Sequence, residues 1–123
     1  MAKNYETLDA WKEAVELATA IYEIAATFPK EELFGIVSQL RRTAISISSN
    51  IAEGYGRKSL KERKQFLGIS LGSLNEVESL LIISMRLKFI NDKQFEPIKA
   101  KVELEGRLLG GLLNHISKKL KEE

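Results

Sequence analysis

The feature that most constrains the fold is a repeat of apolar residues at steps of three and four along almost the whole chain. Near the start it runs through Leu8, Trp11, Val15, Ala18, Tyr22 and Ala25. Residues at this spacing return to one side of an α-helix, so the repeat predicts amphipathic helices that each bury one face. A chain of 123 residues with 44% apolar content is long enough to bury one continuous core, and we expect a single domain.

Four such segments follow one another, separated by short polar or helix-breaking stretches. The predicted helices cover about 8–28, 33–53, 60–88 and 95–120. Pro29 ends the first, because a proline pushes the residue before it away from the helical region and supplies no backbone donor. In the second, the letters ISIS alone resemble a strand, but the longer three-four repeat favours a helix. Four helices joined by short loops predict an all-α protein with an antiparallel up-down-up-down bundle.

Turn and capping residues mark the helix ends. Gly54 and Gly56 tolerate positive φ and are expected to end the second helix. Two pairs of residues match the capping box at the starts of the third and fourth helices, namely Ser59 with Glu62 and Asn91 with Gln94. Pro97 would then lie beyond the first turn of the fourth helix, where a proline can bend the start.

The residues needed for most catalytic and metal chemistry are missing. The chain has no cysteine, which excludes disulfides, thiolate nucleophiles and cysteine-based metal sites. The carboxylates that suggest a metal site in a helix bundle are Glu53, Glu76, Glu78 and Glu105. A di-iron site needs Glu-x-x-His on two helices, but the sole histidine, His115, has Leu112 at that spacing. A catalytic serine lacks a strand-turn-helix frame. We therefore expect no enzyme, no cofactor and no metal.

Charge and hydropathy along the chain add little about location. The formal net charge is only +2, so composition alone predicts no large field of one sign. The first 14 residues contain no apolar h-region, and apolar runs elsewhere are short and interrupted by charge. The sequence therefore predicts neither a signal peptide nor a membrane span, and a cytoplasmic protein is the default expectation.

Small and polar residues interrupt the apolar faces of the second and third helices. They are Ser46, Asn50, Glu53 and Gly54 in the second, and Ser70, Gly72, Ser73, Glu76 and Ser84 in the third. A serine on a helix can bond to the carbonyl four residues earlier, and an Asn or Glu can fix the register of two helices by a polar contact. Glycine inside a helix costs about 1 kcal/mol relative to alanine, so Gly68 and Gly72 indicate that another backbone comes close. We expect these residues to pack helices.

Basic residues gather where the third helix begins. Arg57, Lys58, Lys61, Arg63 and Lys64 stand against a single acid, Glu62, for a local charge of +4, and Arg41 and Arg42 of the second helix add to them. This cluster predicts a phosphate-binding surface whose affinity comes mostly from counterion release and falls with salt. The alternative is an ordinary solvated helix face, since no aromatic platform for base stacking accompanies the cluster.

Two longer stretches, FPKEELFGIVSQLRRTAISISSNIAEGYGR and FLGISLGSLNEVESLLIISMRLKFI, carry a resemblance that covers almost the full length. In the order FP, QLRR, SNIAEG, GR and FL-x-x-x-x-GSL-x-E, the chain resembles the bacterial four helix bundle proteins first noticed as products of intervening sequences in large-subunit ribosomal RNA genes. The resemblance implies a left-handed antiparallel four-helix bundle that assembles into a homopentameric ring. A related branch, the accessory variability proteins of diversity-generating retroelements, consists of basic pentamers that bind nucleic acid and a reverse transcriptase.

The family signature matches this chain at two groups of positions, with two departures. The matched residues are Arg41, Arg42, Ser49, Asn50, Glu53, Gly54, Gly56 and Arg57, followed by Gly72, Ser73, Leu74 and Glu76. Members commonly have proline where this chain has Ser48, so no proline kink is expected in the second helix. They also have a small glycine turn where this chain has Lys88 and Phe89, which predicts a longer third helix.

Two hypotheses for function follow. The first is a non-enzymatic homo-oligomer that binds RNA or DNA through basic residues repeated around a ring. The second is a protein-protein scaffold or adaptor for a reverse transcriptase or another locus-encoded partner, without direct nucleic-acid binding. A ring requires that the exposed face of the first or third helix is still apolar once the core is filled, and Tyr5, Tyr22 and Tyr55 are candidates for such contacts.

Overall fold

The computed structural model describes residues 4–122, and within them the chain is all-helical, with four long helices and no strand. The long helices are α1 (Asp9–Ala25), α2 (Ser38–Tyr55), α3 (Leu60–Arg86) and α4 (Asp92–Glu122). A short 3-10 helix, η1 (Asn4–Thr7), precedes α1, and a 3-10 turn, η2 (Lys30–Glu32), and a π-helical turn, η3 (Leu33–Val37), lead into α2. The expected all-α four-helix bundle is confirmed.

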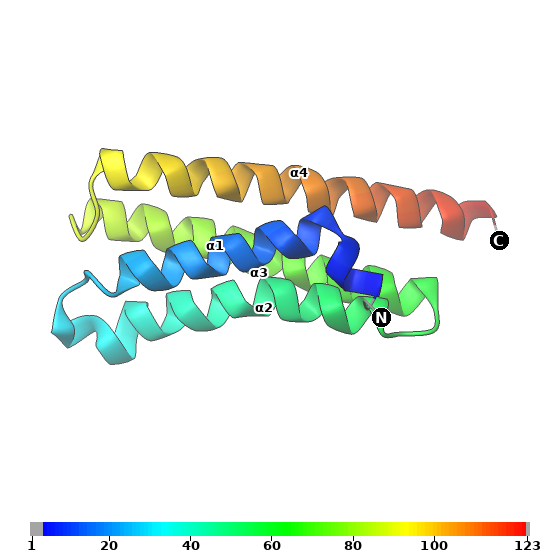
Figure 1. Ribbon diagram of the computed structural model, residues 1–123, viewed down its shortest axis with the longest axis horizontal. Coiled ribbons are helices and arrows are strands. Elements are labelled where there is room, and N and C mark those ends of the chain that lie inside the picture. Colours follow the sequence, from blue (N-terminus) through cyan, green and yellow to red (C-terminus); the bar gives the residue numbers. More distant parts are fainter. Residues whose placement is uncertain (1–3, 123) are drawn as a thin grey trace.

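The four helices lie side by side along the long axis of the molecule (Figure 1). The α1–α2 and α3–α4 turns lie at one end, while the α2–α3 turn and the end of α4 lie at the other. Each helix packs against two others, because α1 and α3 both contact α2 and α4. Segments far apart in the sequence, such as the start of α3 and the end of α4, therefore lie at the same end of the bundle.

The apolar repeat of α1 fills the core, but from a line next to the one emphasised in the sequence. The buried residues are Ala10, Ala14, Leu17, Ile21, Ile24 and Ala25. The neighbouring line lies at the edge of the core: Leu8, Trp11 and Ala18 are only partly buried, and Tyr22 is 40% exposed. The apolar stripe is broad enough to span both lines, so its period predicts a helix while packing chooses its centre.

The α1–α2 connection differs most from the sequence prediction. Helix α1 ends at Ala25 and not at 28, and the backbone N–H of Phe28 donates to the Ala25 carbonyl at 3.1 Å. The Phe28 ring is buried and packs on Phe89, with centroids 5.4 Å apart. A π-helical turn with a non-helical residue, Gly35 (φ −108°, ψ −115°), occupies the first part of the predicted second helix.

The capping residues behave as their pattern indicates. The backbone N–H of Glu62 donates to Ser59 Oγ at 3.1 Å. Asn91 and Gln94 form the reciprocal box, each backbone N–H donating to the other's side-chain oxygen at 2.9 Å. This box starts α4 at Asp92, three residues before the predicted boundary at 95, and leaves Pro97 inside the helix.

The turn that needs positive φ is not the one expected. None of the described glycines has positive φ, and Gly56 ends α2 at φ −86°. Lys88 has φ 65° instead, and it closes α3 with two bonds: its N–H donates to the Met85 carbonyl, and the N–H of Phe89 donates to the Ser84 carbonyl, both at 2.9 Å. This is the Schellman arrangement, usually built on glycine. It ends α3 at Arg86, so the longer third helix expected from the sequence is wrong.

Candidate functional site

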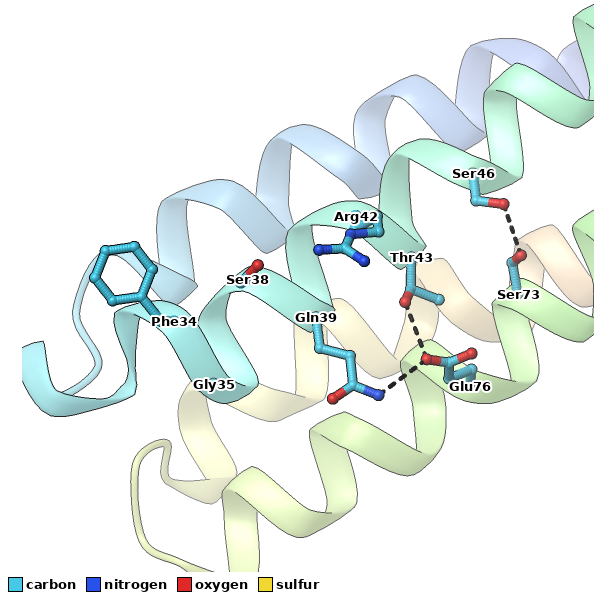
Figure 2. Close-up of a pocket in the computed structure, with 9 residues that line it drawn as sticks. All are labelled: Phe34, Gly35, Ser38, Gln39, Arg42, Thr43, Ser46, Ser73 and Glu76. Carbon is cyan, nitrogen blue, oxygen red and sulfur yellow. Dashed lines mark hydrogen bonds between the residues drawn. The ribbon is translucent and has the colours of Figure 1, made fainter.

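A polar groove runs along the seam between α2 and α3 (Figure 2). It has a volume of about 480 Å³ and is lined by Phe34, Gly35, Ser38, Gln39, Arg42, Thr43, Ser46, Ser73 and Glu76. The residues from α2 are spaced so that they face α3, and three of those predicted to pack helices, Ser46, Ser73 and Glu76, are among them. Three residues of the signature matched in the sequence, Arg42, Ser73 and Glu76, therefore meet in the groove.

Glu76 ties α3 to α2 through one of its two carboxylate oxygens. Oε2 accepts from Thr43 Oγ1 at 3.1 Å and from Gln39 Nε2 at 3.3 Å. No cation among the described residues pairs with this carboxylate, since the one ion pair they form is Arg57 with Glu53 at 3.1 Å. The groove thus keeps an exposed negative group whose position is set by two neutral donors.

The serines of the seam are bonded across it. Ser46 Oγ and Ser73 Oγ lie 2.9 Å apart, and Ser70 Oγ, fully buried, donates to the Ile47 carbonyl at 2.8 Å. Asn50 stays within α2, where its Nδ2 donates to the Ser46 carbonyl and to Ser46 Oγ at 2.8 and 2.9 Å. The contact between helices comes from Ser46, with Asn50 orienting it, and not from an Asn50 bond to Glu53 or Glu76.

The glycines of the seam have different roles. A Cβ on Gly54 would lie 3.0 Å from Phe66 Cβ and 3.3 Å from the Arg63 carbonyl, so α3 approaches α2 closely there. A Cβ on Gly68 or Gly72 would meet nothing within 4 Å. The expectation that another backbone comes close to Gly68 and Gly72 is therefore wrong for the described part of this chain, because both glycines lie on the outer surface of α3.

Three of the predicted phosphate-binding arginines are engaged within the protein. Arg57 lies 4.9 Å from the centre of the Phe66 ring and also pairs with Glu53. Arg63 lies 4.1 Å from the centre of the Tyr55 ring, and its Nε donates to the Gly54 carbonyl. Burial raises the pKa of Tyr55, and the Arg63 charge acts in the opposite direction. Aromatic rings do accompany the basic cluster, but the arginines of the chain itself already cover them.

Arg41 joins α1 to α2. Its Nη2 donates to the Tyr22 carbonyl at 3.4 Å, and its guanidinium lies 4.9 Å from the centre of the Tyr22 ring. Its Nε is buried without a hydrogen-bond partner among the described residues. Arg42 is exposed in the groove and forms no hydrogen bond or ion pair within residues 4–122. The two neighbouring arginines therefore lie on different sides of α2: Arg41 contacts α1, and Arg42 lines the groove toward α3.

The remaining cations of the predicted phosphate-binding cluster lie at the same end of the bundle as a second group of lysines, which the sequence did not link to them. Lys58, Lys61 and Lys64 are exposed at the α2–α3 turn and the start of α3. The last turns of α4, which reach the same end of the bundle in Figure 1, carry the exposed Lys118, Lys119 and Lys121. We call these six lysines the basic end. More than 50 residues separate its two halves, so only the helix arrangement brings them together.

Glu105 is the most unusual titratable group in the protein. It is 0% exposed on α4, and neither carboxylate oxygen has a hydrogen-bond partner among the described residues. Burial, with a smaller contribution from the nearby Glu13 of α1, raises the pKa of Glu105 to about 8. Sequence analysis noted Glu105 only as a possible metal ligand, whereas residues 4–122 contain no group of three His, Cys, Asp or Glu placed to hold a metal. Its position in the apolar repeat of α4 was the available signal of burial.

Several large apolar side chains on or next to α3 stay exposed after the core is filled. Ile69, Ile82 and Ile83 in the helix and Leu87 at its C-cap are each 45–53% exposed, among polar residues that are also exposed. Length and apolar composition alone would suit α3 to a membrane span, although a single such helix is weak evidence, since the core helix of a soluble protein meets the same criterion. Exposed apolar side chains are thus present on α3, one of the two helices on which a ring would need them.

The three tyrosines proposed for contacts between copies have different surroundings. Tyr5 packs edge-on against Trp11 with ring centroids 5.3 Å apart, and Tyr55 is partly buried beneath Arg63. Tyr22 is 40% exposed, beside Arg41. Of the three, Tyr22 therefore offers the most accessible apolar surface with a cation next to it.

Comparison with known proteins places this architecture in a family. The family model described as 23S rRNA-intervening sequence protein matches residues 6–111. A crystal structure of a protein of unknown function from the S23 ribosomal protein family of Bacteroides thetaiotaomicron has the same fold, with a TM-score of 0.76 and 25% sequence identity. The match covers 85% of this chain and 97% of that one. Comparison with curated proteins gives no match.

Proposed function

The chain belongs to the 23S rRNA-intervening sequence protein family, and from this premise we propose that it is a non-enzymatic, homo-oligomeric accessory protein that binds RNA or DNA. The observation that supports the proposal is the basic end, where two distant segments place six exposed lysines at the same end of the bundle. A lysine is a flexible point charge suited to a phosphate, and binding through several of them releases condensed counterions. The contacts would be to the nucleic-acid backbone, which fix position and carry no direct base readout.

Assembly into an oligomer would repeat this weak phosphate-binding site once in each copy. In this proposal the bundle is left-handed and antiparallel, and five copies form a ring. The placement of the turns at alternating ends in Figure 1 supports the antiparallel arrangement. Burial of the exposed apolar face of α3 would contribute to that assembly. Five copies at +2 each sum to about +10, so several basic ends could engage one nucleic acid at once.

The test is fluorescence anisotropy with a labelled single-stranded RNA, across a range of salt concentrations. The variant Lys61→Glu/Lys64→Glu reverses two charges in the basic end, and Lys93→Glu/Lys99→Glu reverses two exposed charges near the start of α4, at the opposite end of the bundle. We expect the first to weaken binding strongly and to reduce the salt slope by about 0.7 for each lost phosphate contact. We expect the second to change the slope little. Absent binding at low salt, or equal effects of the two variants, would reject the basic end as the site.

A second function is favoured by the engagement of Arg41, Arg57 and Arg63 within the protein, which leaves fewer free cations than the sequence suggests. In this alternative the protein is a scaffold for a polymerase-like partner such as a reverse transcriptase, and the apolar face of α3 meets that partner. Co-purification from the native host distinguishes the two functions. Recovery of nucleic acid with no protein partner counts against the scaffold.

A further inference from the structure

One aromatic side chain is almost completely exposed. Phe34 is 94% exposed, more than any other large apolar residue described. It lies in the π-helical turn before α2, next to the non-helical Gly35, and lines one end of the α2–α3 groove. Figure 2 shows its ring turned away from Glu76 and toward the outside. Because burying a phenylalanine is strongly favourable, a ring held out by a specific backbone turn suggests a contact beyond the chain itself.

An apolar pocket of about 420 Å³ lies on the other side of the same turn. Ala25, Ala26, Phe28, Pro29, Lys30, Leu33, Val37 and Arg41 line it, so it belongs to the α1–α2 side of the bundle, whereas Phe34 belongs to the α2–α3 side. One of its lining residues, Leu33, is 47% exposed. Another lining residue, Arg41, has a buried Nε that forms no hydrogen bond with the described residues. A pocket of this kind suits an apolar side chain with a hydrogen-bond acceptor beside it.

The charges beside the ring and beside the pocket are complementary. A Cβ on Gly35 would lie 3.7 Å from Glu32 Oε1, so a carboxylate stands next to the residue that follows Phe34. Lys30 and Arg41 are the charged residues of the pocket. Arg42 is a cation on the same side as Phe34 and lines the same groove. The carboxylate of Glu32 beside Gly35 is therefore opposite in sign to the two cations of the pocket.

We propose that Phe34 of one copy inserts into the apolar pocket between α1 and α2 of the next copy. The proposal rests on the homo-oligomer of the proposed function and names the residues of its contact. In a ring whose axis runs along the bundles, rotation brings equal heights of neighbouring copies together, and Phe34 and the pocket are at the same height because they share one turn. They lie on different sides of the bundle, which is the head-to-tail arrangement that a closed ring requires.

The absence of cysteine allows a direct test in the full chain. Ser38→Cys places a thiol one turn after Phe34 in the groove, and Ala26→Cys places one in the pocket. When the two variants are mixed and treated with a short thiol cross-linker, we expect a covalent dimer on a denaturing gel. Each variant alone should give none, and neither should Ala26→Cys mixed with Glu103→Cys, which carries an exposed thiol on α4.

The contribution of the Phe34 side chain is tested by adding Phe34→Ala to the Ser38→Cys chain, which should abolish the cross-link. By light scattering, Phe34→Ala alone should weaken association of neighbours about 10- to 100-fold, while Ile82→Ala, on an exposed part of α3, should weaken it less. Thermal unfolding measured at a protein concentration low enough for the copies to dissociate should be unchanged, since the side chain of Phe34 is exposed in the single chain. An oligomer without the cross-link would overturn the inference and leave the proposed assembly intact. A monomer for the unmodified protein would reject both.

Discussion

The α2–α3 seam and the α1–α4 seam handle polar side chains in opposite ways. Along α2–α3, the hydroxyls of Ser46, Ser70 and Thr43 each bond to the other helix, at 2.8–3.1 Å. Between α4 and α1, Glu105 is fully buried, forms no hydrogen bond with any other described residue and lies near Glu13, which opposes its ionisation. The first seam has many small polar groups with partners, while the second has one large polar group without any.

The difference shows what a packed helix seam tolerates. A serine hydroxyl carries one donor and can reach a backbone carbonyl, so burying it costs little once that bond forms. A carboxylate needs several donors, and an unpaired one in an apolar site is far more costly, so it takes up a proton instead. The serine bonds of the α2–α3 seam are therefore expected to be insensitive to pH, whereas the α1–α4 seam is expected to depend on it.

The largest predicted effect concerns Glu105. Its pKa is about 8 in the folded state against an ordinary value of 4.5, so the folded protein holds a proton that the unfolded chain releases. The stability linked to this group is fully present below pH 4.5 and is lost as the pH rises to about 8. Glu105→Gln should remove this dependence, so that the variant gains about 1.4 kcal/mol per pH unit relative to the parent, or about 4 kcal/mol between pH 5 and pH 8.

Urea unfolding at pH 5, 6.5 and 8 measures this effect. Glu103→Gln, an exposed neighbour on α4, is the control and should leave the pH profile unchanged. Equal profiles for Glu105→Gln and the parent would mean that the α1–α4 seam does not hold a protonated carboxyl.

The next effect tests the close approach at the α2–α3 seam. Gly54→Ala would place a Cβ 3.0 Å from Phe66 Cβ and should destabilise the fold by about 1–3 kcal/mol, because helices that pack this closely must separate. Gly68→Ala, where a Cβ meets nothing within 4 Å, should instead stabilise it by about 0.5–1 kcal/mol. Opposite signs in urea unfolding are expected, and two changes of the same sign would contradict the packing difference.

A smaller effect separates bonding across the seam from bonding within a helix. Ser70 and Ser84 are both fully buried in α3, but Ser70 donates to Ile47 of α2, while Ser84 donates to Leu80 of its own helix, each at 2.8 Å. Ser70→Ala should cost about 1 kcal/mol, the net value of a typical hydrogen bond. Ser84→Ala should cost less, because the bond it loses joins no second helix. Thermal unfolding of both variants checks the order.

The smallest predicted change in stability concerns the end of α3, outside both seams. Lys88 has positive φ at the end of α3, which is unfavourable for a residue with a Cβ. Lys88→Gly should stabilise the protein by about 0.5–1 kcal/mol, with no change in its pH profile. Calorimetry should show a higher melting temperature, and a lower one would mean that the lysine side chain makes a compensating contact.

Much of the fold follows from local patterns. The three-four repeat predicts four helices, and the caps at Ser59 and Asn91 mark where α3 and α4 begin. The α1–α2 connection escaped prediction, because a π-helical turn around Gly35 has no distinctive residue pattern and Phe28 continues the apolar repeat after α1 has ended. At the end of α3, Lys88 occupies a turn that pattern reasoning assigns to glycine.

The candidate site was only partly accessible to such reasoning. The seam residues Ser46, Ser70, Ser73 and Glu76 were identified as helix-packing residues, but the partners Thr43 and Gln39 were missed. These partners depend on which carbonyl or carboxylate of the facing helix lies within reach. Sequence spacing places a side chain on one face of a helix, but it does not say what stands opposite.

By itself the sequence determined the number of helices, their apolar faces and several of their ends, because period and capping depend on residues within a few positions of one another. Only the tertiary structure decided that two distant groups of lysines share one end, that Phe34 stands outside, and that Glu105 is sealed in the core without a partner. These outcomes depend on how each helix is rotated and which helix is its neighbour. That choice is made by packing the whole core at once.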